Sequence, residues 1–424
     1  MEYCLAIDIG ASSGRHIVGW REQGAIQTEE VYRFPNGMQE ENGHLTWDTE
    51  ALLCHVKKGI EEAVRRFGRI QSLSIDTWGV DYVLLKGDKI IPPAYAYRDT
   101  RNEKAAGQVH QVIPFSELYR KCGIQYLSFN TVYQLYADKE EGRLGQADDY
   151  LMMPEYLMYR LCGNKAHEYT NATTGSLVNA GSGQIDREIT EKLGFPEFVN
   201  APLRKPGEKI GEYQGISVVL CATHDTASAV AGIPMEGDSL FLSSGTWSLI
   251  GAKIDTPLTD EQSQNSGYSN EGGVGCITYL KNIQGMWLVN ELRREMCPGK
   301  DFSLIVQEAM QSDFEGTIQA DSDAFMAPLS MKQAFDEALG VPMQEADYFR
   351  CAYLSLAKCY AQAVKNLEGQ TGKKYERLYI VGGGAKNDFL NRLTEKETGL
   401  QVIALPIEAT ALGNLAVQFD ALEK

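Results

Sequence analysis

The sequence predicts an α/β protein made of two similar halves, and three observations support this. Strand-like apolar runs alternate with helix-like amphipathic segments along the 424 residues. A strand, a tip of small residues and a second strand occur at 5–20 and again at 239–253. The stretch 233–238 contains Pro and Gly, as boundaries often do. We therefore expect one domain over residues 1–235 and a second over 236–424.

Composition narrows the class of protein. A net charge of −17 argues against binding to nucleic acid or to an anionic membrane. No apolar run approaches the roughly 20 residues that cross a bilayer, and no signal peptide is visible. The nine cysteines are scattered, odd in number and without a Cys-x-x-Cys pair, which favours reduced thiols, most of them in the core. We expect a cytoplasmic protein, monomeric or a small homo-oligomer, without a structural metal.

The opening run LAIDIGASSGR at 5–15 predicts a hairpin with Asp8 at the end of its first strand. Gly10 and Gly14 permit the backbone to turn its N–H groups toward one point, and such a cluster binds anions. A carboxylate beside an anion site suggests a divalent cation between them. An ordinary tight turn is equally compatible, because Asp and Gly are turn formers. The Walker loop and the dinucleotide fingerprint do not fit.

The segments after the hairpin predict helices and strands in turn. In the first half they are a helix over 51–67 stopped by Gly68, strands at 70–75 and 82–85, helices and loops over 100–200, a strand at 218–222 and a helix start at 227–232. In the second half they are strands at 239–242 and 249–253, a helix over 348–367 closed by Gly369, a strand at 377–381 and a helix over 386–396.

Polar residues follow several of these strands, where ligands gather in α/β sheets. They are Asp8, Asp76, Asp81, Asp225, Ser244 and Thr246. Asp225, between His224 and Thr226, is a candidate general base for a substrate hydroxyl. Capping of the following helix is an equally good explanation.

Three consecutive glycines, Gly382 to Gly384, separate a predicted strand from a predicted helix. Glycine is costly in backbone entropy, so the run needs a reason. Either a flat ligand lies against bare backbone there, or strand and helix cross closely.

Many segments resemble, in order and over nearly the whole chain, the FGGY family of carbohydrate kinases. They are DIGASSGR at 8–15, SIDTWGVDYVLL at 74–85, AYRDTR at 96–101, FNTVYQL at 129–135, EYTNATT at 168–174, THDTASAV at 223–230, SSGTWSLIG at 243–251, NEGG at 270–273, LKNIQGMWL at 280–288, IVGGGAKN at 380–387 and PIEATALGN at 406–414. The resemblance implies an actin-like fold of two ribonuclease-H-like domains with ATP and sugar between them. Relatives continue past residue 414, so we expect the second domain to be short at its C-terminus.

Within the family the chain is similar to the branch that acts on L-rhamnulose. The resemblance implies ATP-dependent phosphorylation of the sugar's primary 1-hydroxyl to give L-rhamnulose 1-phosphate, with Mg²⁺. It implies that Asp225 is the catalytic base and that Asp8 holds the metal. The implied ATP-binding residues are Ala11, Ser12, Ser13, Gly14, Arg15, Thr246, Asn290 and Gly383. The implied sugar-binding residues are Gly79, His224, Asp225, Thr226 and Asn282.

Further candidates and alternatives remain at this point. Trp78 forms either a wall for the methyl group of a 6-deoxy sugar or a core anchor. Residues 97–99 and 170–171 are further candidates for the sugar side. The alternative functions are a kinase for a related ketose or polyol, an actin-like ATPase without a sugar substrate, and a sensor that binds without turnover.

Overall fold

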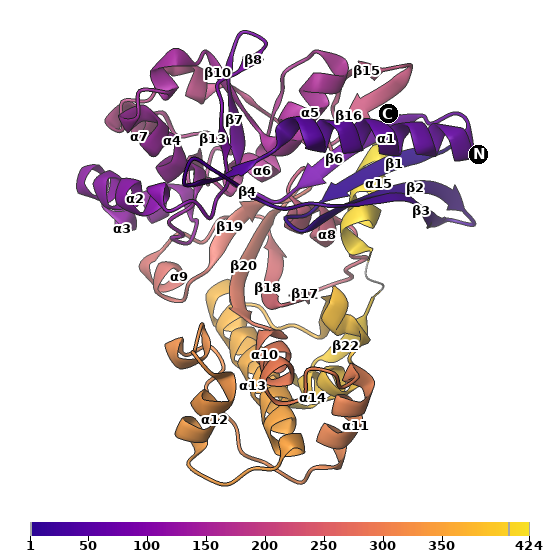
Figure 1. Ribbon diagram of the computed structural model, residues 1–424, viewed down its shortest axis with the longest axis vertical. Coiled ribbons are helices and arrows are strands. Elements are labelled where there is room, and N and C mark those ends of the chain that lie inside the picture. Colours follow the sequence, from indigo (N-terminus) through magenta and orange to yellow (C-terminus); the bar gives the residue numbers. More distant parts are fainter. Residues whose placement is uncertain (1, 406–407, 424) are drawn as a thin grey trace. The chain divides into compact units, whose positions relative to one another are not determined.

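The computed structural model describes residues 2–405 and 408–423, so the first two residues of the segment 406–414 lie outside it. The chain forms two compact units (Figure 1). Unit 1 consists of Met1–Ile233, Lys253–Tyr279 and Glu408–Lys424, and unit 2 of Pro234–Ala252 and Leu280–Ile407. In the described part, no helix is long and apolar enough to cross a membrane. All nine cysteines are free thiols, and four of them are buried.

Unit 1 is built on a mixed six-stranded sheet in the order β15-β16-β6-β1-β2-β3. The strands are β1 (Cys4–Ile9), β2 (Ser13–Glu22), β3 (Ala25–Pro35), β6 (Ser72–Thr77), β15 (Lys209–Tyr213) and β16 (Ile216–Val219). The central strand β1 pairs antiparallel with β2 and parallel with β6. The strand predicted at 218–222 lies earlier in the chain, because β16 begins at Ile216 and its regular pairing ends at Val219.

The alternation of side chains along β1 explains how both faces of this sheet are covered. Leu5, Ile7 and Ile9 face a core that includes residues of α1 (Thr49–Phe67) and α5 (Met153–Cys162). Cys4 and Ala6 face α15 (Ala409–Leu422) on the other side. By the same alternation Asp8 follows Cys4 and Ala6, and therefore lies on the α15 side of the sheet.

The helix α1 shows how local sequence sets an element's ends. Asp48 accepts a hydrogen bond from the N–H of Ala51 at the start. Gly68 ends the helix at φ 72°, a backbone conformation that suits glycine. The predicted helix over 51–67 is confirmed, two residues longer at its start.

The middle of unit 1 is mostly helix and loop, as predicted, and has its own apolar core. Its helices are α2 (Arg101–Val112), α3 (Phe115–Cys122), α4 (Thr131–Glu140), α6 (Tyr169–Thr173) and α7 (Arg187–Lys192). The short strands of unit 1 outside the six-stranded sheet include β4 (Gln39–Glu41), β5 (His44–Trp47), β7 (Tyr82–Lys86), β8 (Lys89–Ile90), β9 (Ala94–Tyr95), β10 (Asp149–Met152), β11 (His167–Glu168), β12 (Val178–Asn179), β13 (Gln184–Ile185) and β14 (Leu203–Arg204). The helices α8 (Asp225–Ala231) and α9 (Glu261–Asn265) also belong to unit 1.

The second sheet has the order β19-β20-β18-β17-β21-β22. Its strands are β17 (Ser239–Ser244), β18 (Trp247–Ile254), β19 (Ser269–Gly272), β20 (Ile277–Gln284), β21 (Arg377–Val381) and β22 (Gln401–Ala404). The helices of unit 2 are α10 (Trp287–Met296), α11 (Phe302–Gln311), α12 (Met331–Leu339), α13 (Glu345–Thr371) and α14 (Asp388–Thr398). The prediction that Gly369 closes α13 was wrong, because Gly372 at φ 67° does so one turn later.

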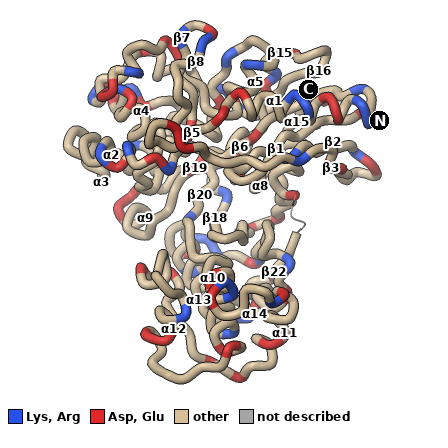
Figure 2. Tube along the Cα trace, in the orientation of Figure 1, with Lys and Arg blue, Asp and Glu red and all other residues tan. Residues whose placement is uncertain are grey.

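Acidic and basic residues are interspersed along the trace (Figure 2). The excess of acid is therefore spread over the chain and does not form one acidic segment. This is the pattern of an ordinary solvated surface.

Candidate functional site

The first hairpin has the free N–H groups that a phosphate site needs. Its tip is held by the N–H of Gly10, which donates to the Ser13 carbonyl at 2.9 Å, and by Asn36, whose side chain donates to the Gly10 carbonyl at 2.8 Å. In residues 2–405 and 408–423, no acceptor is recorded for the N–H groups of Ala11 and Ser12. These two donors are available to an anion.

Ser13 and Gly14, also predicted to bind ATP, belong to β2 and not to the tip. A Cβ at Gly14 would overlap the Phe34 ring. Packing therefore explains this glycine without any ligand.

Arg15 binds Asp8 directly. Its Nε and Nη2 atoms lie 2.9 Å from Oδ2 of Asp8, which is the residue opposite it in the β1–β2 ladder. Burial raises the pKa of Asp8, and the Arg15 guanidinium lowers it. In this structure Arg15 neutralises the carboxylate that was predicted to hold a metal.

A second carboxylate, Asp76, lies beside Asp8 in register on β6. It is fully buried, and its Oδ2 accepts a hydrogen bond of 2.6 Å from the Asn414 amide of α15. Its Oδ1 has no partner in the described part of the chain. Burial and the neighbouring Asp8 hold the pKa of Asp76 well above its usual range.

The donor set around Asp8 suits magnesium. Among the described residues, no group of three or more His, Cys, Asp or Glu side chains could hold a metal ion. Mg²⁺ does not need such a cage, since it keeps several waters and binds one or two carboxylates plus substrate phosphates. A carboxylate beside free N–H donors, with an orphaned carboxylate oxygen behind it, fits that requirement.

Asp225 is the first residue of α8, and its carboxylate is held at one oxygen only. Oδ1 accepts the N–H of Thr226 at 2.6 Å and the Thr226 hydroxyl at 3.3 Å. Oδ2 has no partner within the described residues, and 36% of the side chain is exposed. The carboxylate therefore contacts the helix start, as the capping interpretation expects, and keeps one oxygen free for a proton.

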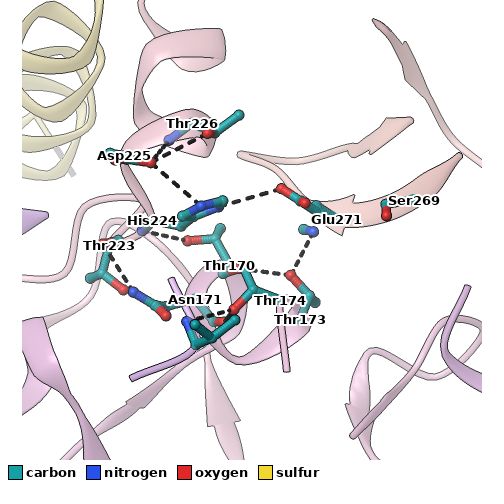
Figure 3. Close-up of polar contacts among 12 residues, drawn as sticks. Thr170, Asn171, Thr173, Thr174, Thr223, His224, Asp225, Thr226, Ser269 and Glu271 are labelled. Carbon is teal, nitrogen blue, oxygen red and sulfur yellow. Dashed lines mark hydrogen bonds and ion pairs between the residues drawn. The ribbon is translucent and has the colours of Figure 1, made fainter. Parts of the chain in front are cut away.

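His224 lies between two carboxylates, as Figure 3 shows. Its Nε2 is 3.4 Å from Oδ1 of Asp225, and its Nδ1 is 3.4 Å from Oε2 of Glu271. Burial raises the pKa of Glu271, and the nearby His224 offsets part of this rise. Sequence reasoning missed Glu271, although the motif at 270–273 contains it, because a single acid within a short polar strand carries no signal of its own.

Gly79 approaches α6 and its flanking turn. The next residue, Val80, has φ 68°, which is a strained conformation for a β-branched side chain. Three hydrogen bonds hold it: its N–H donates to the Thr174 hydroxyl, and its carbonyl accepts from Thr131 and Gln134. Strain of this kind is typical of functional sites.

Trp78 is a core residue. It is buried, its ring centroid lies 4.1 Å from that of Trp47, and both indole N–H groups donate to Oδ2 of Asp81. Burial raises the pKa of Asp81 to about 6. Asp81 is thus a structural carboxylate, and the core-anchor interpretation of Trp78 fits better than the sugar wall.

The other residues predicted for the sugar side fall into two groups, one with a structural role and one beside His224. Asp99 accepts hydrogen bonds from the N–H groups of Leu45 and Arg101, which is a structural role. Thr170 and Asn171, by contrast, lie beside His224 and Thr223 in Figure 3.

The second hairpin borders a cavity of about 720 Å³ inside unit 2. Its tip, Gly245 and Thr246, joins β17 to β18. The cavity is lined by Gly245, Thr246, Met286, Asn290, Phe302, Ser303, Val306, Gly383, Gly384, Lys386, Asn387 and Asp388. The predicted nucleotide-side residues Thr246, Asn290 and Gly383 therefore share one hollow. Asn282, predicted to contact the sugar, is exposed on β20 in the part of that strand that belongs to unit 2.

The three glycines have different reasons. Gly382 has φ 86°, and a Cβ at Gly384 would overlap the Ser244 side chain, so both glycines allow a close approach to the end of β17. Gly383 has nothing within 4 Å of its Cβ position and lines the cavity. Close packing thus explains Gly382 and Gly384, although the neighbour is a strand and not the predicted helix, and a flat ligand against Gly383 stays a prediction.

Known proteins are similar to this chain over nearly its whole length. Residues 3–232 match the N-terminal domain and residues 240–422 the C-terminal domain of the FGGY family of carbohydrate kinases. A rhamnulokinase of Halalkalibacterium halodurans is 38% identical over 440 residues, covering 100% of this chain and 94% of that protein. A rhamnulokinase of Bacteroides thetaiotaomicron is 39% identical over 434 residues, covering 98% of this chain and 90% of that protein.

Solved structures agree on the fold. A ligand-bound xylulose kinase from Lactobacillus acidophilus superposes with a TM-score of 0.84 at 17% identity, covering 100% of this chain and 90% of that one. Plasmodium falciparum glycerol kinase with ADP gives 0.80 at 13% identity, covering 100% and 90%. The predicted α/β, actin-like fold is thereby confirmed. The chain belongs to the FGGY family of carbohydrate kinases.

Proposed function

We propose that this protein transfers the γ-phosphoryl group of ATP to the 1-hydroxyl of L-rhamnulose, giving L-rhamnulose 1-phosphate and ADP. The observation that carries the substrate assignment is the 37–39% identity, over nearly the whole chain, to proteins named rhamnulokinase. Family membership supports ATP as the phosphoryl donor.

Asp225 is the proposed general base. Its free Oδ2 takes the proton of the sugar hydroxyl as that oxygen attacks the γ-phosphorus, and the bond from phosphorus to the β–γ bridging oxygen breaks to release ADP. Thr226 fixes the other carboxylate oxygen, which sets the direction of the free one. Such a positioned base contributes typically about 10²- to 10⁴-fold to the rate.

His224, Thr226, Gly79 and Asn282 are the proposed sugar contacts, and Glu271 joins them as a second carboxylate behind His224. Imidazole, hydroxyl and carboxylate groups suit the several hydroxyls of a ketose. Hydroxyl-binding sites discriminate strongly, whereas one methyl group is worth only about 1–3 kcal/mol. Weak activity on related ketoses is therefore expected.

Mg²⁺, held by Asp8 directly or through water, would neutralise phosphate charge when bound. The N–H groups of Ala11 and Ser12 are the proposed contacts to the ATP phosphates, with Ser13, Gly14 and Arg15 beside them. With ATP bound, the phosphate and Asp8 would compete for the guanidinium of Arg15, which pairs with Asp8 in this structure.

The cavity of unit 2 is the proposed site for the nucleotide. Phe302, Met286 and Val306 offer apolar surface, and Asn290 offers an amide for hydrogen bonds. Gly383 lets a flat group lie against bare backbone, and Thr246 approaches the phosphates.

The substrate is tested by measuring ADP release with ATP and, in turn, L-rhamnulose, L-fuculose, D-xylulose, L-ribulose and glycerol. We expect the highest kcat/KM for L-rhamnulose and a product phosphorylated at carbon 1 by NMR. A higher value for another sugar would assign a related ketose. ADP release independent of sugar would favour an ATPase, and no turnover a sensor.

The base is tested with Asp225→Asn. We expect sugar phosphorylation to fall by at least about 100-fold while ATP binding stays within about twofold. Asp48→Asn is the matched control, since Asp48 also stands at a helix start and accepts a backbone N–H. Full activity of Asp225→Asn would remove Asp225 from the mechanism.

A further inference from the structure

One buried carboxylate of unit 1 has no role in the predictions above, although it contacts the residues next to the proposed sugar site. Glu168 ends β11 and immediately precedes α6, and its side chain is completely buried. A buried carboxylate is expensive unless donors surround it. Glu168 is surrounded by donors from two separate segments.

Five hydrogen bonds converge on this carboxylate. Three come from the start of α6: the Thr170 N–H at 2.8 Å, the Thr170 hydroxyl at 2.6 Å and the Asn171 N–H at 3.1 Å. Two come from Thr223, whose hydroxyl donates at 2.7 Å and whose N–H donates at 3.3 Å. Oε2 alone accepts four of the five.

The second set is informative because of where Thr223 stands. It directly precedes His224 and Asp225, so a bond to Thr223 fixes the backbone that carries the proposed base. Capping of α6 needs only the N–H groups of Thr170 and Asn171. The bonds from Thr223 are therefore not explained by a helix cap.

Helix α6 also makes hydrogen bonds to the two segments that flank His224. The Asn171 amide donates to the Thr223 carbonyl at 3.2 Å, and the Thr173 hydroxyl accepts the N–H of Gly272 at 2.8 Å. Gly272 follows Glu271, the carboxylate that faces Nδ1 of His224. Figure 3 shows α6 between the segment of Thr223 to Thr226 and the strand of Glu271.

We propose that Glu168 is a positioning residue, which holds Asp225 and the sugar-contacting groups in one geometry by tying Thr223 to the start of α6. The inference rests on the proposed function of Asp225. A base misplaced by about 1 Å can cost about 100-fold in rate, so the effect belongs in kcat.

The test compares Glu168→Gln and Thr223→Val with Asp186→Asn, using the sugar with the highest wild-type turnover. Asp186 is also buried at a helix start, where it accepts the N–H of Ile189 and the amide of Asn179, but it contacts none of Glu168, Thr170, Asn171 or Thr223. For Glu168→Gln we expect kcat to fall at least tenfold beyond Asp186→Asn, with KM for ATP within twofold. For Thr223→Val we expect a fall of at least threefold, and the double variant should resemble Glu168→Gln alone.

Thr223→Val keeps the cap of α6 and decides the matter if Glu168→Gln does not fold. An unchanged kcat in folded Thr223→Val, or equal losses in Glu168→Gln and Asp186→Asn, would overturn the proposal. A wild-type protein without turnover on any sugar would instead refute the proposed function, which separates the two failures.

Discussion

The two hairpins use one backbone design in different chemical surroundings. The tip between β1 and β2 has Asp8 and Arg15 at its base, with Asp76 alongside. The tip between β17 and β18 has Ser244 at its base and rests on the glycines after β21. The first surrounds its free N–H groups with charge, and the second borders a mostly uncharged hollow.

The same contrast extends to the buried acids. Among the residues that the structure describes, burial raises the pKa of six carboxyl groups, and all six belong to unit 1: Asp8, Asp76, Asp81, Glu155, Glu168 and Glu271. Hydrogen-bond donors lower the pKa of other acids in both units, such as Glu188 in unit 1 and Asp301 in unit 2. The proposed base Asp225 and the proposed metal ligand Asp8 belong to unit 1, so the proposed function takes its ionisable groups from unit 1 and a shaped surface for the nucleotide from unit 2.

The largest effect is expected when the charge of the first hairpin is removed. Asp8→Asn keeps the side chain's shape but loses the charge that would hold Mg²⁺, so turnover should fall at least 100-fold, about 3 kcal/mol. ADP affinity measured by calorimetry without metal should change less than threefold. Asp388→Asn, at the cavity of unit 2, is the control and should leave the dependence of rate on Mg²⁺ unchanged. Equal changes in Mg²⁺ dependence for Asp8→Asn and Asp388→Asn would contradict the proposed difference between the two hairpins.

The buried acids predict a pH dependence of stability. Burial raises the pKa of Glu155 from 4.5 to about 7. Between these values the folded protein keeps a proton that the unfolded chain has released, so its stability falls as pH rises from 4.5 to 7, by about 3 kcal/mol from this group. Glu155→Gln should remove that share of the slope in urea unfolding followed across pH. Glu61→Gln, on the exposed side of α1, should not.

The smallest effects are expected at Gly383 and Gly384, beside the second hairpin, where alanine should affect stability and ADP binding differently. Gly384→Ala places a methyl group against Ser244 and should cost about 1–3 kcal/mol of stability, measured by urea unfolding. Gly383→Ala has open space and should leave stability within about 0.5 kcal/mol while weakening ADP binding several-fold. The reverse pattern would contradict the assignment of Gly383 to the cavity.

Elements with a strong period and clear end signals were predictable from the sequence. The helix over 51–67 and the strand over 377–381 match the structure closely, because apolar spacing and Gly68 define them locally. The end of α13 was missed because Gly369 tolerates a helical position, and packing extends the helix to Thr371. The links of Glu168 to Thr223 and of Glu271 to His224 were missed because the partners are distant in the sequence, and only the fold brings them together.

The last helix carries a further consequence. Gln418 of α15 donates to the Leu5 carbonyl and accepts from Ser72, while Leu415 packs against Cys4 and Ala6. During synthesis on the ribosome, the first strand emerges some four hundred residues before the helix that covers it. The face of β1 that α15 covers therefore stays exposed until residues 409–422 have been made, and in this period the nascent chain depends on whatever shields that face from aggregation.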